Sequence, residues 1–201
     1  MKKTILITIM TTLIGANIAS CTAQSEEPAA TQSKSDTEVV INNIMSRRSI
    51  RKYKDLAVGR DALDKIIECG INAPNGMNQQ NYEVKVVNDP ASTKYLSENL
   101  NGLYPAPVYF FIAAGNQYDM SPIDCGLLSE NICLAATAYG LGSINLGLPV
   151  RALKEKPEIL KKLGFSDNYN ISLVLALGYP DEAPAAKPRN AEKVQFITVS
   201  E

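Results

Sequence analysis

An unbroken apolar run, VYFFIAA from Val108 to Ala114, constrains the fold of this chain more than any other stretch. It is rich in β-forming residues and lacks the polar alternation of a strand with one face in water, so it predicts a strand that is covered on both faces. The chain has 201 residues, of which 45% are hydrophobic and 20% charged. A chain of this size and composition can supply both covers within one domain.

Helical periodicity before and after this run supplies the covering elements. Ser35 and Glu38 have capping-box spacing, and apolar residues then recur at helical intervals. Gly70 suits the end of a second helix, and the segment that begins at Pro122 is apolar enough to be a central buried helix. The expected helices are Ser35–Ser46, Arg60–Gly70, Ser92–Leu100, Pro122–Tyr139 and Arg151–Leu163.

Three further segments predict strands, namely Tyr82–Val86, Ile171–Leu177 and Val194–Val199. The glycines between Gly140 and Gly147 predict that the chain turns after the long helix. Several connections are too short for parallel crossovers throughout. We therefore expect an α+β fold, with a mixed, mainly antiparallel sheet flanked by helices.

The N-terminus has the features of an export signal. Lys2 and Lys3 precede a short apolar stretch, and the string IASC, which ends at Cys21, resembles a bacterial lipoprotein box. We expect a signal peptide over residues 1–20, a lipidated Cys21, a polar tether over 21–36 and a folded domain over 37–201. The expected location is the membrane of a bacterial cell envelope, reached through the lipid anchor only. An ordinary secretory signal with an incidental cysteine is the alternative.

Composition argues against several classes of function. The net charge is −1, from 20 basic and 21 acidic residues, so no global field attracts nucleic acid. The chain has no histidine, and Cys69, Cys125 and Cys133 lack the spacing of metal ligands, so neither a zinc site nor a Cys/His nucleophile is expected. These three cysteines are interpreted as small core residues.

Four separated stretches are candidates for chemistry. They are RRSIRKY from Arg47 to Tyr53, the amide-rich Asn72–Val87, the glycine-rich Ala138–Pro149, and KPRN from Lys187 to Asn190. Each has an ordinary explanation when taken alone: a solvated helix end, turn chemistry, a chain reversal and an exposed tail. The glycine spacing of the third stretch is not that of a dinucleotide fingerprint.

In this order and spacing, the four stretches resemble the FMN-dependent nitroreductases, and the resemblance covers nearly all of Thr37–Phe196. It implies a nitroreductase-like fold in a domain-swapped homodimer, with FMN held in a composite site. The sequence departs from the family pattern in the second stretch, where Asn75 replaces a serine, Asn81 a proline and Tyr82 a tryptophan.

The resemblance also assigns roles to individual residues. Arg47, Arg48 and Ser49 are expected at the flavin phosphate and ribityl chain, Arg51 at the N1 and O2 edge, and Lys187 and Arg189 around the phosphate. The remaining positions belong to two further segments, the first of which is a loop. The residues expected to reach the partner subunit's flavin are Pro74, Asn75, Gly76 and Asn78. The residues whose backbone is expected against the flavin, with an N–H toward N5, are Asn145, Leu146, Gly147 and Leu148.

The implied function is reduction of a small oxidant, such as a nitroaromatic or a quinone, by ping-pong hydride transfer through FMN. No side chain is expected to act as an obligate acid or base. NAD(P)H and a membrane electron carrier are both candidate donors. The rival hypotheses are another flavin reaction on this fold, such as reductive dehalogenation, and a surface lipoprotein that binds flavin without turnover.

Overall fold

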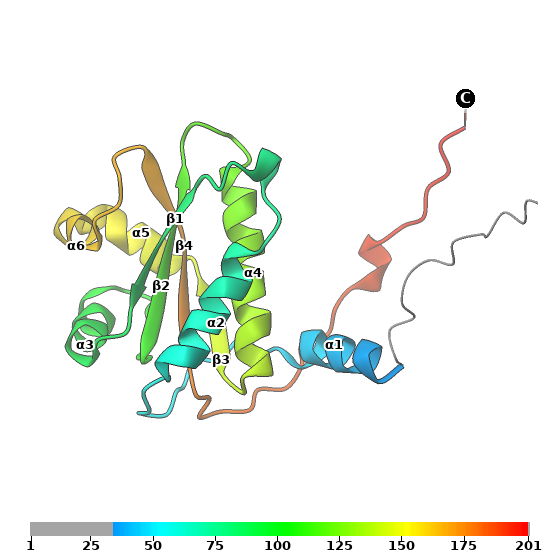
Figure 1. Ribbon diagram of the computed structural model, residues 1–201, viewed down its shortest axis with the longest axis horizontal. Coiled ribbons are helices and arrows are strands. Elements are labelled where there is room, and N and C mark those ends of the chain that lie inside the picture. Colours follow the sequence, from blue (N-terminus) through cyan, green and yellow to red (C-terminus); the bar gives the residue numbers. More distant parts are fainter. Residues whose placement is uncertain (1–33, 201) are drawn as a thin grey trace, which may run out of the picture.

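The computed structural model describes residues 34–200 and places one antiparallel sheet between two layers of helices (Figure 1). The strand order is β1-β2-β4-β3, and each neighbouring pair is antiparallel. The strands are β1 (Tyr82–Val87), β2 (Val108–Gly115), β3 (Gly142–Leu146) and β4 (Tyr169–Gly178). The α-helices are α1 (Lys34–Ser46), α2 (Arg60–Ile71), α3 (Pro90–Asn99), α4 (Ser121–Ala138), α5 (Leu148–Glu155) and α6 (Pro157–Leu163).

Strand β2 is buried along its whole length, which confirms the prediction for Val108–Ala114. Its side chains alternate between two cores, because successive residues of a strand point to opposite faces. Phe110 and Ile112 pack with α2 and α4, whereas Tyr109 and Phe111 pack on the side of α3, α5 and α6. Figure 1 shows these two groups of helices on opposite sides of the sheet.

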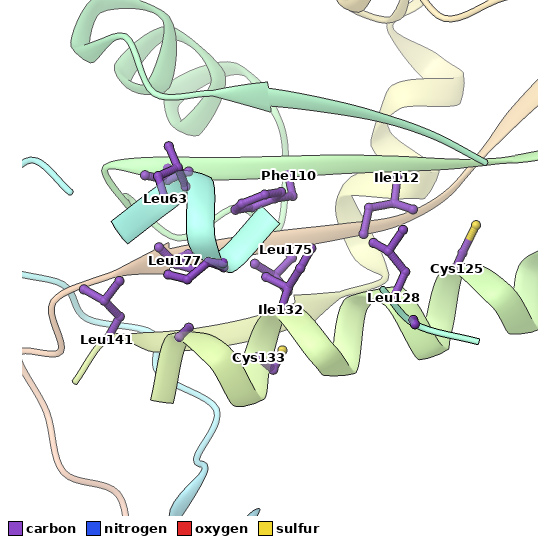
Figure 2. Packing of buried hydrophobic residues seen from close by; sticks show 14 of the residues in the cluster. Leu63, Phe110, Ile112, Cys125, Leu128, Ile132, Cys133, Leu141, Leu175 and Leu177 are labelled. Atoms are coloured by element: carbon purple, nitrogen blue, oxygen red, sulfur yellow. The ribbon is translucent and has the colours of Figure 1, made fainter. Parts of the chain in front are cut away.

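Helix α4 is the buried helix that the sequence predicted. Figure 2 shows Leu128 and Ile132 reaching toward Phe110 and Leu175 of the sheet. Gly70 is the penultimate residue of α2, so the predicted end of this helix is confirmed to within one residue. A Cβ at Gly70 would stand 2.6 Å from Ile132, so the glycine allows α2 and α4 to approach closely.

Three expectations about the C-terminal half are wrong. The glycine-rich region holds β3, a strand that the sequence analysis missed because its glycines suggested only a turn. Two helices replace the single helix expected over Arg151–Leu163: α5 begins at Leu148, and α6 begins at Pro157. The helix breaks before Pro157 because proline has no backbone N–H and a fixed φ angle. Val194–Val199 forms no strand, because no described strand lies beside it.

The two ends of the described chain lie together, away from the sheet (Figure 1). Helix α1 begins at Lys34, so Ser35 lies within its first turn and the last residues of the expected tether are helical. Asn43 attaches α1 to α4 by donating from its amide nitrogen to the carbonyl of Leu134, at 3.0 Å. No helix within residues 34–200 has the length and hydropathy needed to cross a bilayer. The expected signal peptide and Cys21 lie outside the described residues.

Candidate functional site

The segment Arg47–Tyr53 leaves α1 and is fixed against the edge strand β3. Ser49 forms a parallel bridge with Ser143, and the backbone N–H of Ile50 donates to the carbonyl of Ser143 at 3.1 Å. The hydroxyl of Tyr53 lies 2.7 Å from the carbonyl oxygen of Ile50. Burial raises the pKa of Tyr53 far above its usual value, so this hydroxyl stays protonated and can act as a donor.

Residues 179–189, here named the strap, bring the C-terminal part of the chain to the same place. The N–H of Lys54 donates to the carbonyl of Tyr179, and the N–H of Asp181 donates to that of Lys52, both at 2.9 Å. The strap continues past these contacts to Lys187 and Arg189. Residues that lie far apart in the sequence therefore become neighbours in the fold.

Between the strap and the end of α1 lies a cavity of about 460 Å³, here named the anion pocket. Its wall includes five cationic side chains that come from both ends of the domain. They are Arg47, Arg48, Arg51, Lys187 and Arg189. Ser49 adds a hydroxyl group, and the side chains of Ile44 and Met45 add an apolar wall. The structure thus brings together the five residues predicted at the phosphate and ribityl chain and also Arg51, which was predicted at the N1 and O2 edge.

Three of the cations are already held by neighbouring groups, and Arg48 is one of them, through two backbone carbonyls of its own segment. The Nε atom of Arg47 lies 3.5 Å from Oε1 of Glu130, which is the one acidic side chain of the described residues in the pocket wall. Arg51 donates from its guanidinium to the carbonyl of Ser49 at 3.2 Å, and its head group lies over the ring of Tyr104, 5.9 Å from the centroid. These contacts fix the heads of Arg47 and Arg51 at the pocket.

Residues Asn145–Leu148 are not part of the wall of the anion pocket. They continue from Ser143, the residue that bridges Ser49, to the start of α5. The hydroxyl of Ser129 donates to Oδ1 of Asn145 at 2.6 Å, which ties the side chain of Asn145 to α4. The glycine at position 147 has no heavy atom within 4 Å of the position of a Cβ, so the backbone there is open to approach.

The loop from Pro74 to Asn78 lies elsewhere, at the opposite end of α4 from the end that adjoins α1. The backbone N–H of Gly76 points at both carboxylate oxygens of Asp124, at 3.3 Å each, and Asp124 belongs to the first turn of α4. Met77, Asn78 and Gln80 have left-handed φ angles of 52°, 53° and 49°. The structure therefore does not bring this loop to the anion pocket of its own chain.

Comparison with known proteins identifies the fold. The family model described as "Putative TM nitroreductase" matches residues 39–200. The chain belongs to the nitroreductase family. A solved nitroreductase from Desulfitobacterium hafniense with bound FMN superposes with a TM-score of 0.72 and 26% identity, over 79% of this chain and 98% of that one.

Two relatives add to this likeness at the level of sequence. A protein from Archaeoglobus fulgidus, described as "Putative NADH dehydrogenase/NAD(P)H nitroreductase", is 33% identical over 72% of this chain and 87% of its own. The FMN reductase [NAD(P)H] of Bacillus subtilis is 30% identical over 75% of this chain and 69% of its own. The predicted fold class, an α+β nitroreductase-like fold, is confirmed.

The donor set of this nitroreductase fits a phosphate-bearing cofactor. Guanidinium groups and an ammonium group offer charge-assisted hydrogen bonds, which are about twice as strong as neutral ones, to phosphate oxygens. A pocket of about 460 Å³ is also within the size range of ligand sites. Among the described residues, no three His, Cys, Asp or Glu side chains are grouped to hold a metal ion.

Three residues around the nitroreductase site were missed by sequence reasoning. Glu130 and Glu182 are single acids without a motif, and Tyr104 lies in a loop before β2. Glu130 belongs to α4, on the same helix as Ser129, but helical spacing alone does not tell which face meets Arg47. No local pattern would have identified any of the three, since their neighbours come from distant parts of the chain.

Proposed function

We propose that this protein is an FMN-dependent oxidoreductase that reduces a small oxidant. The observation that carries the proposal is the convergence of five cations from both ends of a nitroreductase domain on one pocket. FMN ends in a phosphate of nearly two negative charges, and each well-formed charged hydrogen bond to it contributes about 1.5–3 kcal/mol. The names of several relatives include FMN or NAD(P)H, which agrees with this assignment.

The protein's own residues have binding and electrostatic roles in this account. FMN, when bound, supplies the hydride-accepting and hydride-donating chemistry. Four cations would hold the phosphate, namely Arg47, Arg48, Lys187 and Arg189, and Ser49 would add a hydroxyl. Arg51 places a positive charge in the pocket wall, which would favour a cofactor that becomes anionic on reduction.

The electron donor is proposed to be NAD(P)H, as the names of the relatives suggest, or a membrane-associated carrier such as a quinol. The second option follows from the expected export and the lipid anchor at Cys21, which would place the domain where nicotinamide donors are scarce. Rapid bleaching of the flavin by NADPH in stopped flow, with none by quinols or membrane fractions, would exclude the membrane donor. The oxidoreductase assignment would remain.

A homodimer completes the proposed site. The loop Pro74–Asn78 lies away from its own anion pocket, so it is free to reach the pocket of a second copy. Apolar side chains are exposed along both chain ends, with Val39 and Met45 of α1 at 67% and 68% and Phe196 fully exposed. Burying these side chains against a second chain would be favourable by about 25 cal/mol for each Å² removed from water.

The experiment that tests the function compares FMN with riboflavin, which has the same ring but no phosphate. We expect the purified protein to bind FMN at least about a hundredfold more tightly than riboflavin, because two or more charged hydrogen bonds are lost with the phosphate. Equal affinities would refute the phosphate role of the anion pocket. A protein that takes up FMN but is reduced by no donor would instead be a flavin-binding surface protein.

A further inference from the structure

Glu182 is an acid in a place where its charge is unfavourable. It belongs to the strap that leads to Lys187 and Arg189, and it contacts the backbone of Arg51, another residue of the anion pocket. A carboxylate beside an anion site repels the anion and weakens its binding. The charge of Glu182 therefore does not explain an acid at this position, whereas its hydrogen bonds to the backbone give it a structural role.

The carboxylate of Glu182 joins the strap to the segment after α1. Its Oε1 atom accepts from the backbone N–H of Arg51 and, at 3.3 Å, from that of Lys52. The same stretch is joined by the N–H of Asp181, which donates to the carbonyl of Lys52 at 2.9 Å. Glu182 thus provides two acceptor contacts where the backbone pairing of the strap ends.

Beyond Glu182 the strap has no comparable attachment. Residues 183–189 form neither helix nor strand, and most of their side chains are exposed. Among the described residues, the next local hydrogen bond along the chain is at Asn190, whose side chain accepts from the N–H of Glu192. The positions of Lys187 and Arg189 relative to Arg51 therefore depend on where the chain is held at Glu182.

We propose that Glu182 is a positioning residue of the anion pocket. It fixes the cations of the strap relative to those of the segment Arg47–Arg51, so that one phosphate meets both sets without further ordering of the chain. This inference rests on the proposed function for the identity of the anion. It concerns a residue that lies outside the pocket wall and acts through the backbone of its neighbours.

Three variants separate the hydrogen bonds of Glu182 from its charge. Glu182→Gln keeps an acceptor oxygen and removes the charge, whereas Glu182→Ala removes both. Asp181→Ala is the matched control, because it removes a neighbouring charge but retains the backbone N–H that contacts Lys52. FMN affinity is measured for each by titration of the cofactor-free protein, with thermal unfolding to confirm that each variant is folded.

We expect Glu182→Ala to weaken FMN binding by about fivefold or more, the effect of losing one to two hydrogen bonds, even though a repelling charge is gone. Glu182→Gln and Asp181→Ala should bind FMN within about twofold of the unaltered protein, or more tightly. Equal FMN affinities of the Ala and Gln variants, at any level, would overturn the proposal.

Hydrogen exchange gives a second readout that needs no cofactor. The amides of Arg51 and Lys52 should exchange faster in Glu182→Ala than in the unaltered protein, and Glu182→Gln should restore the protection. Unchanged exchange in the Ala variant would also overturn the positioning role. An unaltered protein that fails to bind FMN would contradict the proposed function instead, and the exchange rates would still decide whether Glu182 holds the strap.

Discussion

At the scale of single residues, the site depends on charges whose positions are set by backbone contacts. Arg51 is held by the carbonyl of Ser49 and the ring of Tyr104, and Arg47 is held by Glu130. Arg189 is different, because no hydrogen bond or ion pair among the described residues holds its side chain. Its contribution to binding therefore tests whether the C-terminal residues take part in the phosphate site at all.

Replacement of Arg189 by alanine should weaken FMN binding by about tenfold or more, which corresponds to one lost charge-assisted hydrogen bond. Fluorescence titration of the flavin measures the dissociation constant. Lys193→Ala is the matched control, since Lys193 is a cation of the same C-terminal region that is not in the pocket wall. A dissociation constant that stays the same in Arg189→Ala would remove this residue from the site.

The cysteines allow a second test at this scale. Cys125 and Cys133 are buried, and burial raises their pKa values to about 12 and about 11, so both thiols stay protonated at pH 8. Cys69 is exposed on α2, so the interpretation of this cysteine as a core residue is wrong. Because the thiolate is the reactive form, iodoacetamide at pH 8 should modify Cys69 at least about a hundredfold faster than Cys133. Peptide mapping by mass spectrometry gives the rates, and comparable rates in the folded protein would show that Cys133 is not in the core.

At the scale of elements, the molecule has a buried centre, and at both ends of the described chain apolar side chains are exposed. Val194, Phe196, Ile197 and Val199 are exposed and belong to no strand, so the tail contributes no core packing in one copy. The exposed apolar residues of α1 lie in the same region of the molecule (Figure 1). Both ends fit the proposed interface with a second copy.

Removal of residues 194–201 should leave the domain folded but reduce its association. We expect circular dichroism to be unchanged, because no described residue of the tail is buried. Analytical ultracentrifugation should show a dimer for the full chain and a large monomer fraction for the shortened one. A full chain that is monomeric and still binds one FMN per chain would contradict the composite site.

The elements that could be predicted from the sequence are those in which local pattern and tertiary packing agree. The apolar run at Val108 and the long helix after Pro122 are so rich in apolar residues that their composition alone predicts burial, and the structure confirms both. Strand β3 is short and lies between Gly140 and Gly147, so only its pairing with β4 identifies it. The tail has strand-forming residues but no neighbour in its own chain, and β propensity without a partner does not make a strand.

The residues of the anion pocket were predicted through their family resemblance and not through local pattern. Arg47 and Arg189 lie at opposite ends of the domain, and only the pairing of the strap with residues 52–54 brings their segments together. Glu130, Glu182 and Tyr104 escaped prediction because each acts through a contact with a distant segment. Long-range contacts of this kind leave no periodic signal in a single sequence.

At the scale of the whole molecule, positive charge is gathered in one pocket, although the chain as a whole is nearly neutral. The net charge is only −1, yet five cations meet in one pocket, so the attraction for an anion is local and short in range. The sheet and its two helical layers hold this pocket at one edge, beside β3 and α4. The nitroreductase domain thus concentrates its positive charge where the proposed cofactor needs it.

Anaerobic reduction and reoxidation of the FMN-loaded protein tests the central claim most directly. We predict that NADPH or a quinol bleaches the bound flavin with the uptake of two electrons for each FMN. A quinone or a nitroaromatic compound should then restore the oxidised spectrum with equal stoichiometry, as a ping-pong cycle requires. A protein that binds FMN but whose flavin is reduced by no donor, or is reoxidised by no small oxidant in this panel, would contradict the assignment as an oxidoreductase.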